Sequence, residues 1–166
     1  DAQVLKVMVE GVVLNRTVFY PEGGGQPGDI GELIKSDGSI VPILNTIKTQ
    51  NGILHITNSH LSEGFVEEKI QIAIDWERRL KHMKMHTALH VLCSQVAGAV
   101  TGGSVGAQKS RLDFDMPGEK PDKEELEEKI MNIINSDYPL SFSWISESEL
   151  EMKPELVRTM SVKPPI

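Results

Sequence analysis

The sequence has little that would place this protein outside the cell or in a membrane. Its 166 residues contain one cysteine, Cys93, which excludes an intrachain disulfide and favours a reducing compartment. No apolar run approaches the roughly 20 residues that a membrane-spanning helix needs, and no basic stretch followed by an apolar core opens the chain. We therefore expect a cytoplasmic protein without a membrane segment. Because Asp1 stands where an initiator methionine would, we also expect an N-terminal piece to be missing.

Positive charge is scarce as well, and its distribution is uneven. The formal net charge of −7 argues against indiscriminate nucleic-acid binding, which relies on phosphate neutralisation by Lys and Arg. Residues 119–166 hold eleven acids and six bases, so the rest of the chain is nearly neutral. Within that part, Arg78, Arg79, Lys81 and Lys84 form a basic run without an acid inside it. Such a run can be a solvated helix face, but its position just before a histidine motif favours a local contact with RNA phosphates.

Hydrophobic periodicity predicts an α+β protein in two parts. Short period-two runs separated by Gly, Asn, Asp and Ser predict a small β-barrel or sandwich over residues 1–75. The runs are Val4–Glu10, Val12–Asn15, Ile30–Ile34, Ile40–Leu44, Ile53–Thr57 and Ile70 to Ile74. An apolar strand is also expected to lead from Arg16 into a glycine-rich loop.

Residues 76–166 are predicted to form an α+β domain that begins with one long helix, Trp76–Ala99. A strand is expected over Ser110–Met116 after a loop at Gly102-Gly103, and an acidic amphipathic helix over Lys120–Asp137. Leu126, Ile130, Ile133 and Ile134 would form the inward face of that helix. Leu140–Ile145 predicts a further strand. Ser146 and Glu149 have the spacing of a capping box at a helix start.

The pentapeptide His86-Thr87-Ala88-Leu89-His90 lies in the predicted long helix. Residues i and i+4 of a helix point the same way, so both imidazoles can reach one metal ion. The alternative is two histidines on a polar helix face, because a zinc site needs at least one further protein ligand. His82 lies on the same side of the predicted helix as His86 and His90. It is eight residues from His90, which is about 12 Å along a helix axis and too far for both to bind one metal ion. We therefore expect His82 to join the basic patch. Cys93 is expected to be a buried small hydrophobic residue, and His55 and His60 receive no role.

The second chemical motif is a loop with three successive glycines, Gly23-Gly24-Gly25, between Pro21 and Pro27. Backbone without Cβ cover lets amide groups touch a ligand directly. A tight β-turn in a small barrel is the alternative explanation. The loop is not a Walker-type or dinucleotide-binding loop, because no Lys-Ser/Thr follows it and no helix pattern opens directly after it.

Taken together, these segments resemble the editing domain of alanyl-tRNA synthetase and its freestanding relatives, the alanyl-tRNA editing proteins of AlaX type. The resemblance covers nearly the whole chain. It runs over Arg16–Asp29, Asp75–Arg79, His86–His90, Gly106, Arg111–Asp115 and Lys163-Pro164-Pro165. The family carries a second metal motif, Cys-x-x-x-His, beyond the Lys-Pro-Pro stretch. This chain stops at Ile166, so we expect the domain over 76–166 to be truncated at its C-terminus.

The resemblance implies a zinc-dependent hydrolase that removes serine, and also glycine, from tRNA of the alanine acceptor, with the aminoacyl end of tRNA as its partner. His86 and His90 match metal-motif positions, with the other two ligands outside this chain. Gln26 matches a loop glutamine that lines the site, and Thr17 matches the threonine that reads the seryl hydroxyl. Gly24, Gly25 and Gln26 would present hydrogen-bond donors to the ester. The basic run Arg78, Arg79, Lys81 and Lys84 would bind tRNA.

Three alternatives to a freestanding editing enzyme stay open at this stage. The chain can be an editing domain excised from an alanyl-tRNA synthetase. It can be a module that grips an RNA end without chemistry, or whose zinc is only structural. A different zinc hydrolase, acting on a small-molecule ester or amide, would be marked by His-Glu-x-x-His, whereas the spacer here, Thr-Ala-Leu, contains no acid.

Overall fold

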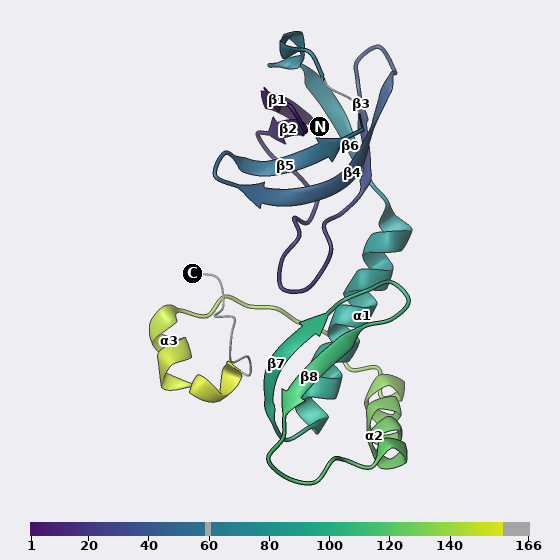
Figure 1. Ribbon diagram of the computed structural model, residues 1–166, viewed down its shortest axis with the longest axis vertical. Coiled ribbons are helices and arrows are strands. Elements are labelled where there is room, and N and C mark those ends of the chain that lie inside the picture. The colour runs from purple at the N-terminus through teal and green to yellow at the C-terminus, as the bar shows by residue number, and fades with distance from the viewer. Residues whose placement is uncertain (59–60, 158–166) are drawn as a thin grey trace. The chain divides into compact units, whose positions relative to one another are not determined.

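The computed structural model describes residues 1–58 and 61–157 and has an α+β fold (Figure 1). His60 and Lys163-Pro164-Pro165 lie outside the described residues. The described residues form two compact units. Unit 1 comprises residues 1–84 and 105–108, and unit 2 comprises residues 85–104 and the chain from Lys109 onward.

Unit 1 contains a closed six-stranded antiparallel barrel, in purple to teal in Figure 1. Its strands are β1 (Ala2–Met8), β2 (Gly11–Leu14), β3 (Gly31–Ile34), β4 (Ile40–Thr49), β5 (Gly52–Thr57) and β6 (Lys69–Ile74). Neighbours follow the order β1-β2-β5-β4-β3-β6, and β1 pairs with β6 to close the barrel. Closure removes the unpaired strand edges that an open sheet would expose.

The barrel core is made of inward-facing aliphatic side chains from these strands. Val4, Val12 and Leu33 are fully buried, in keeping with the alternation that a half-buried strand produces. The short 3₁₀ helix η1 (Glu63–Phe65) adds Phe65 to this cluster. Burying each such side chain contributes about 1.5–3 kcal/mol, so the barrel provides a rigid support for the loops that leave it.

The helix α1 (Trp76–Gln95) follows the barrel, and the division between the units falls within it, between Lys84 and Met85. Residues 76–84 group with the barrel, and side chains of the first turns of α1 bond to a loop of the barrel, as described below. The domain boundary expected at residue 75 stays a prediction. Among the described residues, no helix has the length and apolar character to cross a membrane.

Unit 2 contains the rest of α1, an antiparallel hairpin and two further helices. The hairpin strands are β7 (Ala99–Ser104) and β8 (Arg111–Asp115). Helix α2 (Lys123–Asn135) begins after Asp122, whose side chain accepts a hydrogen bond from the Glu125 amide. Helix α3 (Glu147–Met152) carries the predicted capping box of Ser146 and Glu149 and is followed by the 3₁₀ helix η2 (Pro154–Leu156).

Several predicted elements were wrong. Leu140–Ile145 forms no strand, and Phe142 and Trp144 are 96% and 102% exposed, because no described strand pairs with this segment. Residues 15–20 are irregular and not a strand. Helix α1 ends at Gln95, and β7 replaces the loop expected at Gly102-Gly103. On α2, Ile134 is 49% exposed and does not face inward.

Candidate functional site

The glycine loop is closed at its neck by Tyr20 and Asp29. The Asp29 amide donates to the Tyr20 carbonyl at 2.9 Å, and the Tyr20 amide donates to Asp29 Oδ2 at 2.7 Å. Farther along, the Tyr20 hydroxyl donates to the Gly23 carbonyl at 3.0 Å. Hydrogen bonds within the loop thus fix its neck, and the tip projects from this fixed neck.

The tip of the loop is a tight turn from Gly23 to Gln26. The two residues exchange backbone hydrogen bonds of 3.0 and 3.1 Å, and the φ angles of Gly24 and Gly25 are 58° and 76°. Two consecutive positive φ angles define a type I′ turn, which residues with a Cβ adopt at a cost. The structure therefore supports the tight-turn explanation for the glycines. Gly24 and Gly25 are exposed residues, and their amides make no hydrogen bond with any described residue.

The loop also lies directly on strand β4. A Cβ at Gly28 would come within 2.1 Å of the Thr46 carbonyl oxygen, so only glycine fits this close approach. The Thr46 hydroxyl donates to the Asp29 carbonyl at 2.9 Å, and the Glu22 amide donates to the Thr46 carbonyl at 2.8 Å. Gln26 is only 5% exposed.

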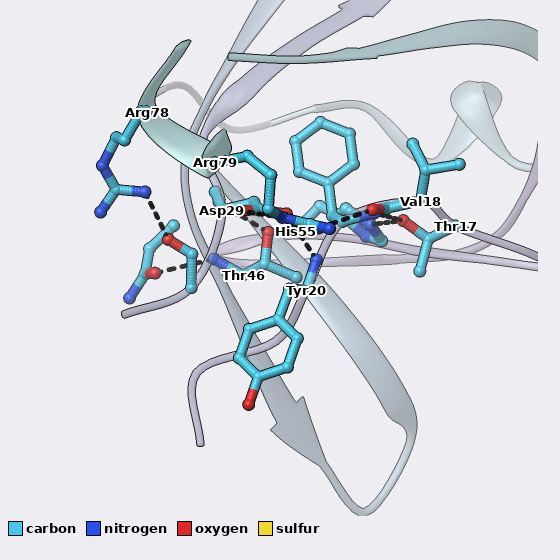
Figure 2. A network of polar contacts seen from close by, with 11 residues as sticks. Thr17, Val18, Tyr20, Asp29, Thr46, His55, Arg78 and Arg79 are labelled. Atoms are coloured by element: carbon cyan, nitrogen blue, oxygen red, sulfur yellow. Dashed lines mark hydrogen bonds and ion pairs between the residues drawn. The ribbon is translucent and has the colours of Figure 1, made fainter. Parts of the chain in front are cut away.

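Two arginines of α1 fasten the loop to the helix, as Figure 2 shows. Arg79 forms a multiple ion pair with Asp29, whose side chain is 2% exposed, and also donates to the Val18 carbonyl. Arg78 Nη1 donates to the Gly28 carbonyl at 2.8 Å. A planar guanidinium with several donors suits this bidentate role.

The four residues of the basic run therefore have two different environments. Arg78 and Arg79 have protein partners, whereas Lys81 and Lys84 are exposed and make no ion pair or hydrogen bond with the described residues. His82 was expected to join the basic patch, and that expectation was wrong. It is 2% exposed, and burial followed by the charge of Arg78 lowers its pKa, which favours the neutral ring.

Thr17, the residue that matches the seryl-reading threonine, lies against a buried histidine of β5. Its Oγ1 is 2.8 Å from His55 Nε2, and it accepts a hydrogen bond of 3.0 Å from the Phe19 amide. His55 is 0% exposed, and burial lowers its pKa. The sequence analysis gave His55 no role. The one available signal was a histidine inside the apolar run Ile53 to Ile56, which a buried strand admits only when the imidazole has partners.

In unit 2, His86 and His90 lie one helical turn apart with parallel rings. Their centroids are 5.1 Å apart and the interplanar angle is 9°. Burial, and then the neighbouring His90, lowers the pKa of His86, which favours the neutral ring that a metal ion binds. Two side-by-side imidazoles fit part of a zinc donor set. Within residues 1–58 and 61–157 no cluster of three or more His, Cys, Asp or Glu side chains could hold a metal.

Cys93 is buried with a free thiol, as expected. The predicted site residues thus fall in both units. Thr17, Gly24, Gly25, Gln26 and the four basic residues belong to unit 1, while His86 and His90 belong to unit 2.

Comparison with known proteins relates this chain to the aminoacyl-tRNA synthetases. Residues 1–78 match the family profile described as tRNA synthetases class II (A). Alanine–tRNA ligase of Pyrococcus furiosus is 35% identical over 92% of this chain, which corresponds to 17% of the ligase. The chain is therefore a relative of a small part of that much larger enzyme.

More similar relatives are named as alanyl-tRNA editing proteins. The alanyl-tRNA editing protein AlaX-M of Methanosarcina barkeri (strain Fusaro / DSM 804) is 40% identical over 90% of this chain and 65% of the relative. AlaX-M of Methanosarcina mazei is 36% identical over 97% of the chain and 68% of the relative. The chain belongs to the alanyl-tRNA editing protein family, as the resemblance predicted. It spans about two thirds, 65%, of the Methanosarcina barkeri relative's length.

Proposed function

We propose that the protein containing this chain hydrolyses the ester that joins serine or glycine to tRNA of the alanine acceptor. The observation that carries the proposal is the clamped loop. Its tip carries Gly24 and Gly25, two exposed residues whose amides have no partner among the described residues. The relatives named as alanyl-tRNA editing proteins supply the substrate class.

Editing is needed because a synthetic pocket cannot strongly reject an amino acid that is smaller or differs by one hydroxyl. A second site faces an easier choice, because it can be built to bond the seryl hydroxyl that alanine lacks. Thr17 would provide that bond, since its hydroxyl is only partly buried beside the loop's first residues.

The loop amides would act on the ester itself. Donors fixed where negative charge develops on a carbonyl oxygen stabilise the transition state, and a preorganised turn needs no rearrangement to supply them. In this proposal Gly24 and Gly25 contribute the amides, and Gln26 holds the turn through its paired backbone bonds with Gly23. Lys81 and Lys84 would contact tRNA phosphates as mobile point charges.

The proposed mechanism also uses a zinc ion, held by His86 and His90 together with ligands that lie outside the described residues. Bound there, zinc would polarise the ester or orient the terminal adenosine or a water molecule. The two imidazoles would bind it as neutral rings, and their spacing of one helical turn puts both on one face of α1.

The test is deacylation of seryl-, glycyl- and alanyl-tRNA of the alanine acceptor, measured side by side in the full-length protein with and without a chelator. We expect seryl- and glycyl-tRNA to be cleared, alanyl-tRNA to be spared, and chelation to abolish clearance. Retained tRNA binding without hydrolysis of any substrate would contradict the proposal and favour a binding module.

The Thr17→Val variant tests the reading of serine. Seryl clearance should fall about ten- to hundredfold, while glycyl clearance should change little, because glycine offers no hydroxyl to bond. Thr101→Val is the matched control, since Thr101 is exposed on β7. Equal losses on both substrates would show that Thr17 supports the loop and does not read the amino acid.

A further inference from the structure

The protonation of the His55 ring follows from its two partners. His55 Nδ1 lies 3.2 Å from the carbonyl oxygen of Val12, its neighbour in the register of β2 and β5. A carbonyl can only accept a hydrogen bond, so Nδ1 must carry the hydrogen. The ring is 0% exposed and packs edge-on against Phe19, a setting that disfavours a second proton. In the neutral ring Nε2 is therefore an acceptor.

The direction of the Thr17 hydroxyl follows in turn. Since Nε2 accepts, the bond of 2.8 Å between Thr17 Oγ1 and His55 Nε2 uses the hydroxyl hydrogen of Thr17. The Phe19 amide occupies one lone pair of Oγ1 at 3.0 Å. A hydroxyl has one hydrogen and two lone pairs, so a single lone pair is left for a ligand. Figure 2 marks the contact between Thr17 and His55 with a dashed line.

We infer that His55 is a positioning residue that fixes the Thr17 hydroxyl as a pure hydrogen-bond acceptor, so that a substrate side chain that reaches Thr17 gains a bond there only if it donates a hydrogen. The inference rests on the proposed function and specifies the chemistry of its selectivity. A seryl hydroxyl can donate, whereas the side chains of alanine and glycine cannot. A hydroxyl free to rotate would lose this preference, since it could donate or accept equally well.

The first test measures the tautomer of His55 directly and does not depend on deacylation activity. In the full-length protein labelled with ¹⁵N, long-range ¹H–¹⁵N correlation spectra report which ring nitrogen carries the hydrogen. We expect a neutral His55 with hydrogen on Nδ1 and an unprotonated Nε2 at pH 7.5. Hydrogen on Nε2, or on both nitrogens, would overturn the inference.

The second test compares two variants of His55 in the deacylation assay. In His55→Gln the side-chain carbonyl oxygen still offers an acceptor to Thr17, whereas His55→Phe removes it. We expect His55→Phe to lower the ratio of seryl to glycyl kcat/KM about three- to tenfold, and His55→Gln to restore most of that ratio. An equal loss on both substrates in His55→Phe would mean a merely structural role and overturn the inference.

A double-mutant cycle with Thr17→Val then shows whether His55 acts through Thr17. Adding His55→Phe to Thr17→Val should leave the seryl-to-glycyl ratio unchanged, because the hydroxyl that His55 directs is gone. A further fall in the ratio would overturn the inference. If His55→Phe does not fold, His55→Leu, which also removes the acceptor, takes its place in the cycle. A wild-type protein that clears no substrate would instead overturn the proposed function, while the NMR spectra still decide the direction of the hydroxyl.

Discussion

The Arg79 guanidinium on α1 is paired with the buried carboxylate of Asp29, fifty residues earlier in the chain. Asp29 also accepts the Tyr20 amide, so one carboxylate joins the neck of the glycine loop to the helix. A charge this deeply buried depends on its partners, because an unpaired carboxylate without water is strongly unfavourable. The loop's position thus depends on a pair that neither local sequence segment reveals.

Replacing Arg79 by Ala should therefore lower the free energy of unfolding by about 3 kcal/mol, as expected when one partner of a buried ion pair is removed. Urea unfolding would measure this loss. The control is Lys129→Ala on α2, whose partner Glu125 is exposed, so that its loss should be within about 0.5 kcal/mol. Equal losses of unfolding free energy in the two variants would show that the buried pair with Asp29 contributes no more to stability than an exposed ion pair.

The turn at the loop tip gives a second prediction. Gly24→Ala should lower the free energy of unfolding by about 1 kcal/mol, because an alanine at a φ of 58° is strained. It should also lower deacylation about tenfold or more by disturbing the neighbouring amide donors. Gly38→Ala is matched to it, since Gly38 has a φ of 82° and open space around it. That control should lose similar stability and keep full activity, and comparable losses of activity in both would contradict the role of the turn.

The exposed lysines of α1 should affect RNA binding through charge. Lys81→Ala or Lys84→Ala should weaken tRNA binding and reduce the slope of log affinity against log salt by up to about one unit each. Binding titrations at several salt concentrations would measure the slope. Lys129→Ala removes the same charge from the acidic helix α2 and should leave the slope unaltered. Unchanged slopes for Lys81 and Lys84 would mean that these residues only solvate the helix.

His86→Ala and His90→Ala should each lower both the zinc content and the deacylation rate of the full-length protein. The reason is that two of the usual three or four ligands are expected on this turn of α1. Metal analysis of purified variants gives the first readout and the deacylation assay the second. Thr87→Ala, an exposed position between the two histidines, serves as the control. Equal zinc and equal rates in wild type and both histidine variants would contradict the proposed metal site.

Buried His82 predicts a dependence of stability on acid. Burial lowers its pKa in the folded protein, while in the unfolded chain it titrates near 6.5. As the pH falls below about 6.5, the unfolded chain binds a proton that the folded protein does not, so the free energy of unfolding decreases. His82→Leu should reduce that decrease.

Urea unfolding at pH 7.5 and pH 5.5 would compare His82→Leu with wild type. At pH 7.5 the variant should be as stable as wild type or more stable, because His82 Nδ1 has no hydrogen-bond partner in the described part of the chain. A loss of more than about 1 kcal/mol at pH 7.5, or the same pH dependence in both proteins, would contradict the prediction.

The local elements with strong periodicity could be predicted from the sequence. The six period-two segments correspond to β1 to β6, and the spacing of Ser146 and Glu149 predicted the capping box. Leu140–Ile145 shows the limit of such patterns. The alternation predicts a face to be buried, but a strand also needs a neighbour for its backbone, and the described residues provide none.

The site residues named from the sequence stay predictions, and the contacts that hold them could not be predicted. Three successive glycines predicted a loop with an unusual backbone, and the positive φ angles of Gly24 and Gly25 show why two of them are needed. The pairing of Asp29 with Arg79 and of Thr17 with His55 joins residues far apart in sequence. Such pairs arise only when barrel closure brings strands and loops together, so no spacing rule could have found them.

One backbone hydrogen bond of the loop joins two segments that emerge at different times during synthesis. The Val105 amide donates to the Gly25 carbonyl at 2.8 Å, and Val105–Gln108 belongs to unit 1 although the strands on either side of it do not. All strands of the barrel and all partners of the loop neck lie within residues 1–84. The loop tip reaches its final hydrogen bonding only after Val105 has emerged. A chain that ends before that point would contain every residue of the barrel and lack the partner of the Gly25 carbonyl.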